Sequence, residues 1–181
     1  FELVAVYGSH RTAGKELAEL TWHLPEGRPN LPELVVRSLD SVISDVDDFE
    51  IVFSALPSDV ARDVEKPLAA EGCYVFSNAS THRMDADVPL VIADLNPHHL
   101  LSLRNRSQSG FVACGTNCTI VPAALPLKPL WDFIGLDEVS ISTEQSLSGG
   151  GIELLSAFRE SGEYPVEIPG EAEKMHEECL S

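Results

Sequence analysis

Residues 50–80, EIVFSALPSDVARDVEKPLAAEGCYVFSNAS, contain the pattern that decides the fold class. The first nine residues form a β-branched and aromatic run that ends in polar turn residues, which is typical of a buried strand. Residues 59–71 then place Val60, Val64 and Leu68 on one face of a predicted helix. CYVFSNAS predicts a second strand that also ends in a polar turn. The stretch therefore predicts two strands joined by a helix.

The same alternation continues on both sides of this stretch. Three other apolar runs end in polar turns and are predicted strands: FELVAVYGS (1–9), PLVIADLNP (89–97) and SGFVACGTN (109–117). Strands joined by helices, with a continuous apolar run in each strand, predict a parallel sheet covered by helices on both faces. The fold class is therefore α/β, and TWHLPEGRPN (21–30) is predicted to be a surface loop.

The pattern changes after residue 119. Residues 120–133 are apolar with helical spacing, although they contain three prolines. EVSISTEQS (138–146) alternates and predicts a strand that opens a second sheet. SLSGGGIELLSAF (146–158) predicts a glycine turn into a helix, and residues 169–181 predict the start of a charged helix. We therefore expect the opening of an α+β domain in this part of the chain.

The composition limits the class of protein. The chain has 181 residues, enough for one domain or part of two, and its formal charge of −17 argues against nucleic acid and anionic membranes as partners. No apolar run approaches the ~20 residues that a membrane span needs, and the first residues do not resemble a signal peptide. A soluble, cytoplasmic protein is therefore expected. The four cysteines lack zinc-type spacing, so we expect reduced thiols and no metal site.

The first polar turn is a candidate cofactor site. The carboxyl ends of parallel strands form the edge of an α/β sheet where ligands bind. Arg11, with Ser9 and Thr12, can accept the 2′-phosphate of NADP at this edge, which favours NADP over NAD. A solvated surface arginine fits the spacing equally well. The G-x-G-x-x-G turn of dinucleotide-binding folds is not found in the sequence.

Cys118 follows another polar turn and precedes the predicted helix of residues 120–133. A cysteine at a helix N-terminus has a lowered thiol pKa, which favours the thiolate and a role as nucleophile. Neighbouring N–H groups and the amide of Asn117 can stabilise an oxyanion. The alternative is an inert buried cysteine, as we expect for Cys73 and Cys114. None of the six histidines shows a sign of pairing with Cys118, and all six are expected at the surface.

Seven segments, in order along nearly the whole chain, resemble the aspartate-semialdehyde dehydrogenases of the branch typical of archaea and fungi. These segments are GSHRTAGK, IVFSALPSDVA, VFSNASTHRMDADVPLVI, LNPHHL, TNCT, STEQSLSGGG and IPGEAEKM. The resemblance implies a Rossmann-type nucleotide domain. It also implies NADPH-dependent conversion of aspartyl phosphate to aspartate semialdehyde, with release of inorganic phosphate. In that family the reaction serves lysine, methionine and threonine biosynthesis and passes through a cysteine thioacyl intermediate.

The resemblance also implies the roles of individual residues. The implied catalytic residues are Cys118, as the nucleophile, and Gln145, which orients the intermediate. The implied substrate contacts are Arg83 and Lys174 to the phosphate, Asn117 to the phosphate and the oxyanion, and Glu171 to the substrate amine. The implied NADP contacts are Ser9, Arg11, Thr12, Ser54, Leu56, Asn96, Ser148, Gly149 and Gly150.

Some parts of the family pattern are not found in the chain. These are the glycine-rich turn before the first strand, and a general acid/base histidine and a carboxylate-binding arginine after GEAEK. We therefore expect an internal fragment. Residues 1–117 would form an NADP-binding domain without its first strand and glycine turn, and residues 118–181 the truncated first part of a catalytic and dimerisation domain.

Two expectations and two alternatives follow for the activity and assembly. The fragment alone is expected to have no turnover, and the complete protein is expected to be a homodimer or homotetramer. A malonyl-CoA reductase-like enzyme remains an alternative, because it has the same fold and the same cysteine. A catalytically silent paralogue that acts as a binding or scaffold subunit is the other alternative.

Overall fold

The computed structural model describes residues 1–105, 110–164 and 170–179, and the chain forms two compact units. Unit 1 comprises Phe1–Pro89 and His98–Gly115, and unit 2 comprises Leu90–Pro97 and Thr116–Ser181. The break after Gly115 lies two residues before the predicted boundary after residue 117. The assignment of a nucleotide function to one part and a catalytic function to the other stays a prediction.

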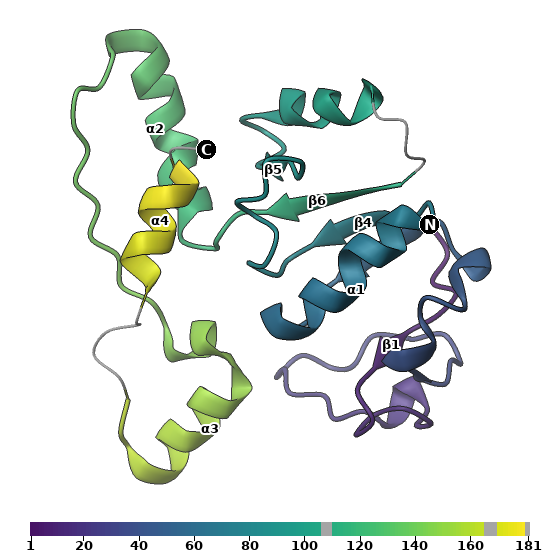
Figure 1. Cartoon of the computed structure of the whole chain (residues 1–181). Helices are drawn as coiled ribbons and strands as arrows, with labels where there is room; N and C mark the ends of the chain where they lie inside the picture. The colour runs from purple at the N-terminus through teal and green to yellow at the C-terminus, as the bar shows by residue number, and fades with distance from the viewer. Residues whose placement is uncertain (106–109, 165–169, 180–181) are drawn as a thin grey trace. The chain divides into compact units, whose positions relative to one another are not determined.

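Unit 1 contains a parallel sheet, as the sequence pattern predicts. Strands β3 (Ile51–Ser54), β4 (Tyr74–Ser77) and β6 (Phe111–Gly115) lie next to one another in this order and all run parallel (Figure 1). The register aligns their carboxyl ends, so that Ser54 pairs with Ser77, and Ser77 with Cys114. The polar residues after these strands therefore begin at one edge of the sheet.

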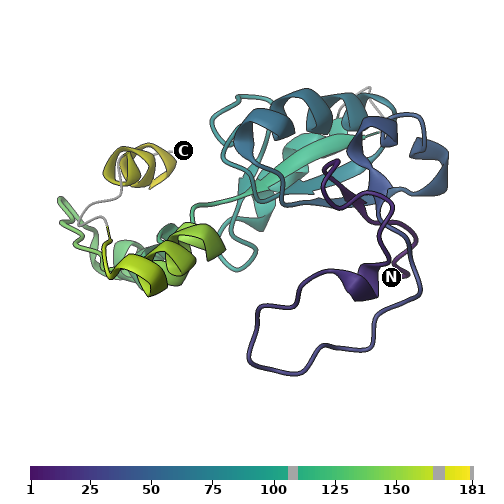
Figure 2. The same cartoon turned by 90° about the horizontal axis from the view of Figure 1, so that it is seen from below.

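Helix α1 (Ser58–Ala70) joins β3 to β4 and packs on one face of the sheet, beside β4 and β6 (Figure 2). This confirms the predicted strand, helix and strand. The buried residues of α1 are Ala61, Glu65, Leu68 and Ala69. The sequence placed Val60 and Val64 on one face with Leu68, but both valines are only half-buried. The helix therefore faces the sheet about one position later than predicted.

A glycine allows α1 and β6 to approach closely. A Cβ atom added at Gly110, just before β6, would lie 2.4 Å from the carbonyl oxygen of Ala69 at the end of α1. Any other residue would therefore push the strand away from the helix. The core beneath this contact is formed by the buried side chains of Leu68, Val75 and Val112.

The other face of these strands carries aromatic side chains. Phe53 is 75% exposed, and Tyr74 and Phe76 are each 38% exposed. Their rings stack in pairs, with centroids 5.8 Å apart for Phe53 and Phe76 and 5.0 Å apart for Tyr74 and Phe111. Among the described residues this face is therefore not fully covered, whereas the sequence predicted helices on both faces.

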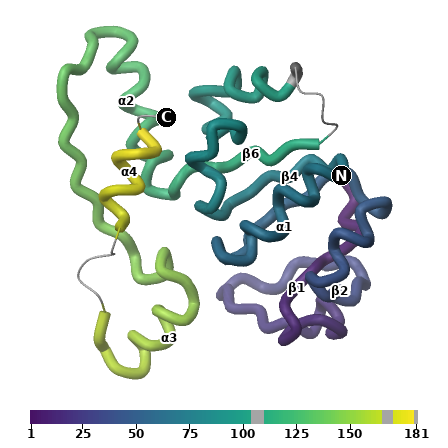
Figure 3. The backbone as a smooth tube through the Cα atoms, viewed as in Figure 1, coloured from purple at the N-terminus to yellow at the C-terminus, as the bar shows by residue number. Residues whose placement is uncertain are grey.

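The first predicted strand is shorter than expected. Strand β1 (Tyr7–Gly8) pairs in parallel with β2 (Arg37–Ser38), and the tube in Figure 3 places the two side by side. The ladder is limited to the two residues of β2, and the side chains of residues 1–4 are exposed. Residues 21–30 form a loop, as predicted. The described residues before β6 also include the 3₁₀ helices η1 (Leu17–Glu19), η2 (Leu39–Ser41), η3 (Val46–Asp48) and η4 (Pro97–Asn105).

Unit 2 is mainly helical in its described part. Its elements are β5 (Leu90–Val91), α2 (Ile120–Ile134), η5 (Leu147–Gly150), α3 (Gly151–Ser161) and α4 (Glu171–Cys179). Helices α2 and α4 contact each other (Figure 1). The three predicted helices are confirmed, including α2 with Pro126 and Pro129 inside it. Nowhere in the described ranges is a helix long and apolar enough to span a bilayer.

The strand predicted for residues 138–146 is wrong. These residues form neither helix nor strand, and Val139 and Ile141 are 45% and 42% exposed. An alternating sequence becomes a strand only when a neighbouring strand satisfies its backbone hydrogen bonds. The structure describes no such neighbour for this segment within the residues it covers.

Candidate active site

The turn that carries Cys118 is organised by Asn117. The backbone N–H and the hydroxyl of Thr119 lie 2.9 and 2.7 Å from the side-chain oxygen of Asn117, and the N–H of Ile120 donates to its carbonyl oxygen at 3.0 Å. Asn117 therefore binds the first N–H groups of α2, which lack partners inside the helix. Asn117 and Thr119 are buried, whereas Cys118 between them is exposed. The turn thus presents the thiol to solvent on a fixed backbone.

Glu171, at the start of α4, collects three side chains around this turn. Its Oε1 atom accepts hydrogen bonds from the amides of Asn117 at 2.9 Å and Gln145 at 3.0 Å. The hydroxyl of Thr119 lies 3.1 Å from the same oxygen. This hydroxyl has one proton, which it shares between Glu171 and Asn117. Three of the residues predicted for the site (Asn117, Gln145 and Glu171) are therefore brought together beside Cys118.

The electrostatics of Glu171 follow from these contacts. Burial alone acts to raise the pKa of this carboxyl, but the hydrogen bonds from Asn117, Thr119 and Gln145 outweigh it, and the positive charge of Lys174 adds to them. The pKa of Glu171 therefore lies below its ordinary value, and the group is a carboxylate at neutral pH. Lys174 itself is exposed, one turn further along α4.

A second carboxylate of α4 was not predicted from the sequence. Glu178 is only 7% exposed, and its Oε2 atom accepts the backbone N–H of Asn117 at 2.6 Å. Glu171, Met175 and Glu178 recur at a spacing that places them on one face of a helix. Because a glutamate is usually solvated, this spacing in EAEKMHEE did not by itself indicate burial.

The glycine turn before α3 lies next to Gln145. A Cβ atom added at Gly149 would lie 3.2 Å from the side-chain oxygen of Gln145, and one added at Gly150 would lie 2.4 Å from the side chain of Leu154. Both predicted glycines therefore allow close packing. The hydroxyl of Ser148 lies 2.6 Å from that of Ser146.

The predicted NADP turn follows β1 in unit 1. The hydroxyl and the N–H of Thr12 both donate to the carbonyl oxygen of Ser9, at 3.1 and 2.9 Å. Ser9 and Arg11 are exposed. A Cβ atom added at Gly8 would lie 2.4 Å from the hydroxyl oxygen of Thr12, so a larger residue there would displace the Thr12 side chain. An exposed guanidinium beside hydroxyl groups fits a phosphate.

The other predicted cofactor contacts have partners of their own. The buried hydroxyl of Ser54 donates to Glu65 at 2.6 Å, while Leu56 is half-buried in the turn before α1. In unit 2, the side chain of Asn96 accepts the N–H of Ile92 at 2.7 Å and donates to the carbonyl oxygen of Leu90 at 3.0 Å. Asn96 therefore closes a backbone turn.

Arg83 lies in unit 1, in the turns that follow β4. Its guanidinium donates to the carbonyl oxygen of Asn78 at 3.0 Å. The neighbouring His82 was expected at the surface, but it is 5% exposed and lies 2.9 Å from Asp85, which in turn lies 2.8 Å from Lys66. The prediction for His82 is wrong because these turns fold back on α1. The described residues contain no cluster of side chains suited to a metal ion.

Two cysteines of unit 1 lie in its core. Cys73 and Cys114 are buried, as predicted, and burial, with the charge of Glu65 adding to it, raises the pKa of Cys114 to about 12.

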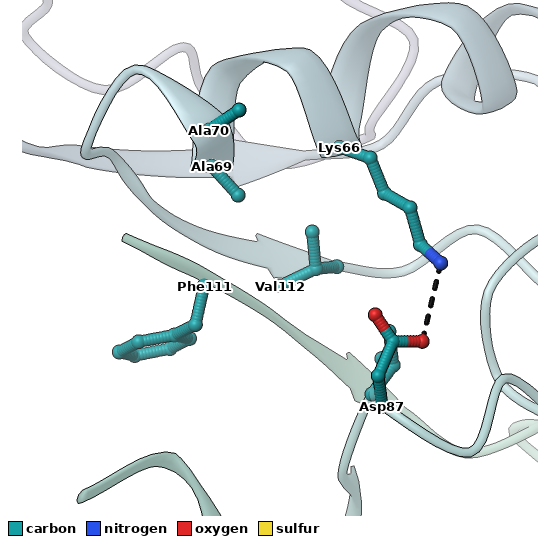
Figure 4. Close-up of a pocket in the computed structure, with 7 residues that line it drawn as sticks. Lys66, Ala69, Ala70, Asp87, Phe111 and Val112 are labelled. Atoms are coloured by element: carbon teal, nitrogen blue, oxygen red, sulfur yellow. Dashed lines mark hydrogen bonds and ion pairs between the residues drawn. The ribbon is translucent and has the colours of Figure 1, made fainter. Parts of the chain in front are cut away.

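A small hollow beside α1 includes Lys66, which is paired with Asp87 at 3.2 Å (Figure 4). None of the predicted site residues lines this hollow.

Comparisons with known proteins identify the family of the chain. Residues 1–103 match the family described as semialdehyde dehydrogenase, NAD binding domain. The aspartate-semialdehyde dehydrogenase of Archaeoglobus fulgidus is 38% identical over 187 residues, which cover 99% of this chain and 53% of that protein. The malonyl-CoA reductase (NADP) of Metallosphaera sedula is 40% identical over 110 residues, which cover 59% of this chain and 31% of that protein.

A solved structure of an aspartate semialdehyde dehydrogenase is also similar to this chain. The crystal structure of aspartate semialdehyde dehydrogenase with NADP from Candida albicans matches with a TM-score of 0.64 and 33% identity, covering 75% of this chain and 41% of that one. The chain spans about half the length of the curated relatives that match it along most of its length. With a family match over more than half of its residues, the chain belongs to the semialdehyde dehydrogenase family.

Proposed function

We propose that this protein is an aspartate-semialdehyde dehydrogenase that uses NADP and forms a thioacyl intermediate on Cys118. The observation that carries the proposal is the cluster around Glu171, which holds Asn117 and Gln145 beside the exposed Cys118. The match to the Archaeoglobus fulgidus enzyme, which includes this whole region, supports it. The cofactor assignment is supported by the exposed Arg11 in the turn after β1 and by the crystal structure of the Candida albicans enzyme with NADP.

In the oxidative direction, the Cys118 thiolate adds to the aldehyde carbon of the substrate and forms a thiohemiacetal. Held at the turn of Ser9, Arg11 and Thr12, NADP would supply the hydride acceptor for the oxidation of that carbon, while the hydroxyl group of the thiohemiacetal loses its proton. The product is a thioester on Cys118, which is activated enough for phosphate to attack it and release aspartyl phosphate. In the biosynthetic direction the same steps run in reverse, and the thiolate displaces phosphate from aspartyl phosphate.

The turn restricts which groups can stabilise the oxyanion. The N–H groups of Asn117, Thr119 and Ile120 each donate to an acceptor within unit 2. We therefore assign this role to the N–H of Cys118, for which the described residues offer no acceptor. The amide of Gln145, held by Glu171, would orient the acyl group.

Charged residues would bind the ends of the substrate. Glu171, a carboxylate at neutral pH, matches a substrate ammonium group. Arg83 and Lys174 would bind the phosphate, and each is one of only 12 basic residues in a chain with 29 acidic ones. We further propose that the complete protein is a homodimer or homotetramer. The exposed apolar side chains of α2, among them Trp131, Phe133 and Ile134, support an assembly that buries them.

The test is an assay of the complete natural protein. It should oxidise aspartate semialdehyde only when both NADP and phosphate are present, and Cys118→Ser should abolish this turnover while the buried-cysteine variant Cys114→Ser retains it. Full turnover by Cys118→Ser would contradict the proposal. No turnover by the natural protein under these conditions would favour a catalytically silent paralogue.

A malonyl-CoA reductase remains the second candidate, because 110 residues of this chain are 40% identical to that enzyme from Metallosphaera sedula. Malonyl-CoA has no amino group at the position that Glu171 would bind. The ionised Glu171, with its three donors, therefore favours the aspartate compound. NADPH oxidation measured with malonyl-CoA and with aspartyl phosphate separates the two: faster turnover of malonyl-CoA would reverse the order.

A further inference from the structure

Glu65 is a fully buried carboxylate that the proposed reaction does not use. It lies on α1 at 0% exposure and reaches the carboxyl ends of β3 and β4. Its Oε1 atom accepts hydrogen bonds from the hydroxyls of Ser54 at 2.6 Å and Ser77 at 2.7 Å. The two serines are direct neighbours in the register of the sheet. Burial of a carboxyl group is costly unless both of its oxygen atoms are hydrogen-bonded, and Oε2 of Glu65 has no partner among the described residues, so Glu65 requires an explanation.

The hydrogen bonds continue from Ser77 into the next turn. Because its hydroxyl proton points to the carboxylate, the oxygen of Ser77 has lone pairs for the N–H of Ala79, which donates to it at 3.0 Å. Within this turn the N–H of Asn78 donates to the carbonyl oxygen of Ser54 at 2.9 Å. The carbonyl oxygen of Asn78 in turn accepts the guanidinium of Arg83 at 3.0 Å.

We propose that Glu65 is a positioning residue that, through Ser77 and the turn of residues 78–80, holds Arg83 in place to bind the phosphate group of the substrate. The proposal rests on the phosphate-binding role proposed for Arg83. It assigns to α1, a helix that carries none of the predicted site residues, an indirect influence on the affinity for phosphate.

A carboxylate suits this task better than an amide. Both serine protons point to Oε1, and Oε2 is buried without a hydrogen-bond partner. In Glu65→Gln an NH₂ group at the position of Oε2 would be buried without an acceptor. With the amide reversed, its N–H groups would donate to the serine oxygens and compete with the N–H of Ala79 for Ser77. Either orientation disturbs the chain of hydrogen bonds from Glu65 through Ser77 to the turn that holds Arg83, without changing the size of the side chain.

Two serine variants form a matched pair for the test. Ser54→Ala and Ser77→Ala each remove one hydroxyl from the same carboxylate, but only Ser77→Ala releases the N–H of Ala79. In the complete natural enzyme we expect Ser77→Ala and Glu65→Gln to raise the KM for phosphate by about tenfold. The KM for aspartate semialdehyde should stay unchanged. Because Ser54 is also a predicted NADP contact, Ser54→Ala is compared at saturating NADP, where it should leave the KM for phosphate within about twofold even if its kcat changes.

Controls separate positioning from general destabilisation. Asp63→Asn, on the exposed side of α1, should leave the KM for phosphate unchanged. Cys114, the next residue in the strand register after Ser77, should stay protected from thiol reagents in both serine variants. An equal rise in the KM for phosphate in Ser54→Ala and Ser77→Ala, or exposure of Cys114 in Ser77→Ala, would show a structural role only and overturn the proposal.

A further variant distinguishes this proposal from the one on which it rests. Arg83→Ala should raise the KM for phosphate at least as much as Ser77→Ala. If Arg83→Ala leaves that KM unchanged, the phosphate-binding role of Arg83 is wrong, and the positioning role proposed for Glu65 is refuted as well. If Arg83→Ala raises the KM and Ser77→Ala does not, the proposed function stands and only the role of Glu65 is refuted.

Discussion

Replacement of Glu178 by alanine tests whether α4 holds the turn that carries Cys118. Glu178 and Asn117 are both 7% exposed, and the carboxylate accepts the backbone N–H of Asn117 at 2.6 Å. A hydrogen bond to a charged group contributes about 1.5–3 kcal/mol, and a buried N–H left without an acceptor costs about 1–3 kcal/mol. Because both values describe the loss of the same bond, we expect Glu178→Ala to lower the free energy of unfolding by about 2–3 kcal/mol.

A matched control lies at the preceding residue. Glu177→Ala removes the same charge from the same helix, but Glu177 is exposed, so the free energy of unfolding should change by no more than about 0.5 kcal/mol. Glu178→Gln retains a neutral acceptor for the N–H of Asn117 and should lose only about 1 kcal/mol. The order Glu178→Ala, Glu178→Gln, Glu177→Ala therefore follows from the hydrogen bond and not from the charge.

The assay is urea unfolding of the complete protein, combined with hydrogen exchange at the amide of Asn117. The exchange rate of this amide should rise in Glu178→Ala and remain unchanged in Glu177→Ala. The rate of Cys118 alkylation should also change in Glu178→Ala and not in Glu177→Ala, because only Glu178→Ala removes the acceptor that anchors the turn. Equal unfolding free energies for Glu178→Ala and Glu177→Ala, with the same protection of Asn117, would refute the reasoning.

Three further predictions concern the acid stability, the thiols and the cofactor. Because the folded state lowers the pKa of Glu171, the unfolded state binds more protons in acid. The stability that this group contributes is therefore present above its unfolded pKa of about 4.3 and is lost as the pH falls through the folded pKa. Urea midpoints measured across this pH range should show a smaller loss of stability in Glu171→Gln. Near neutral pH a maleimide should modify the exposed Cys118 well before the buried Cys114, whose pKa is about 12, and mass spectrometry showing equal rates would contradict this. Arg11→Ala should reduce the preference for NADP over NAD in KM by roughly tenfold or more, whereas Lys15→Ala in the same loop should not; an unchanged preference in Arg11→Ala would exclude a contact with the 2′-phosphate.

The sequence was sufficient to predict the parallel strands and most helices, because each depends on a local pattern of apolar residues. It misplaced the buried face of α1, since no pattern rule puts Glu65 in a core. The glutamate is buried there because Ser54 and Ser77, from two different strands, supply its hydrogen bonds. Such a partnership exists only after the sheet has formed. The predicted strand at residues 138–146 failed for a similar reason, because alternation alone provides no neighbouring strand.

In the candidate site, too, local features could be predicted from the sequence and a long-range contact could not. The turn around Cys118 was predicted from its local pattern, and Gln145 and Glu171 were identified only through the family resemblance; the structure brings Asn117, Gln145 and Glu171 together. Glu178 was missed because its acceptor role involves a backbone N–H 61 residues earlier in the chain. A long-range contact to the main chain has no signature in side-chain spacing beyond the shared helix face.

The central claim is that Cys118 carries the acyl group, and mass spectrometry of the complete protein tests it most directly. Incubation with aspartate semialdehyde and NADP, without phosphate, should trap a thioester on the peptide that contains Cys118. Addition of phosphate should remove it, and Cys118→Ser should form none. An acyl group on another residue, or phosphate-dependent turnover by Cys118→Ser, would contradict the account.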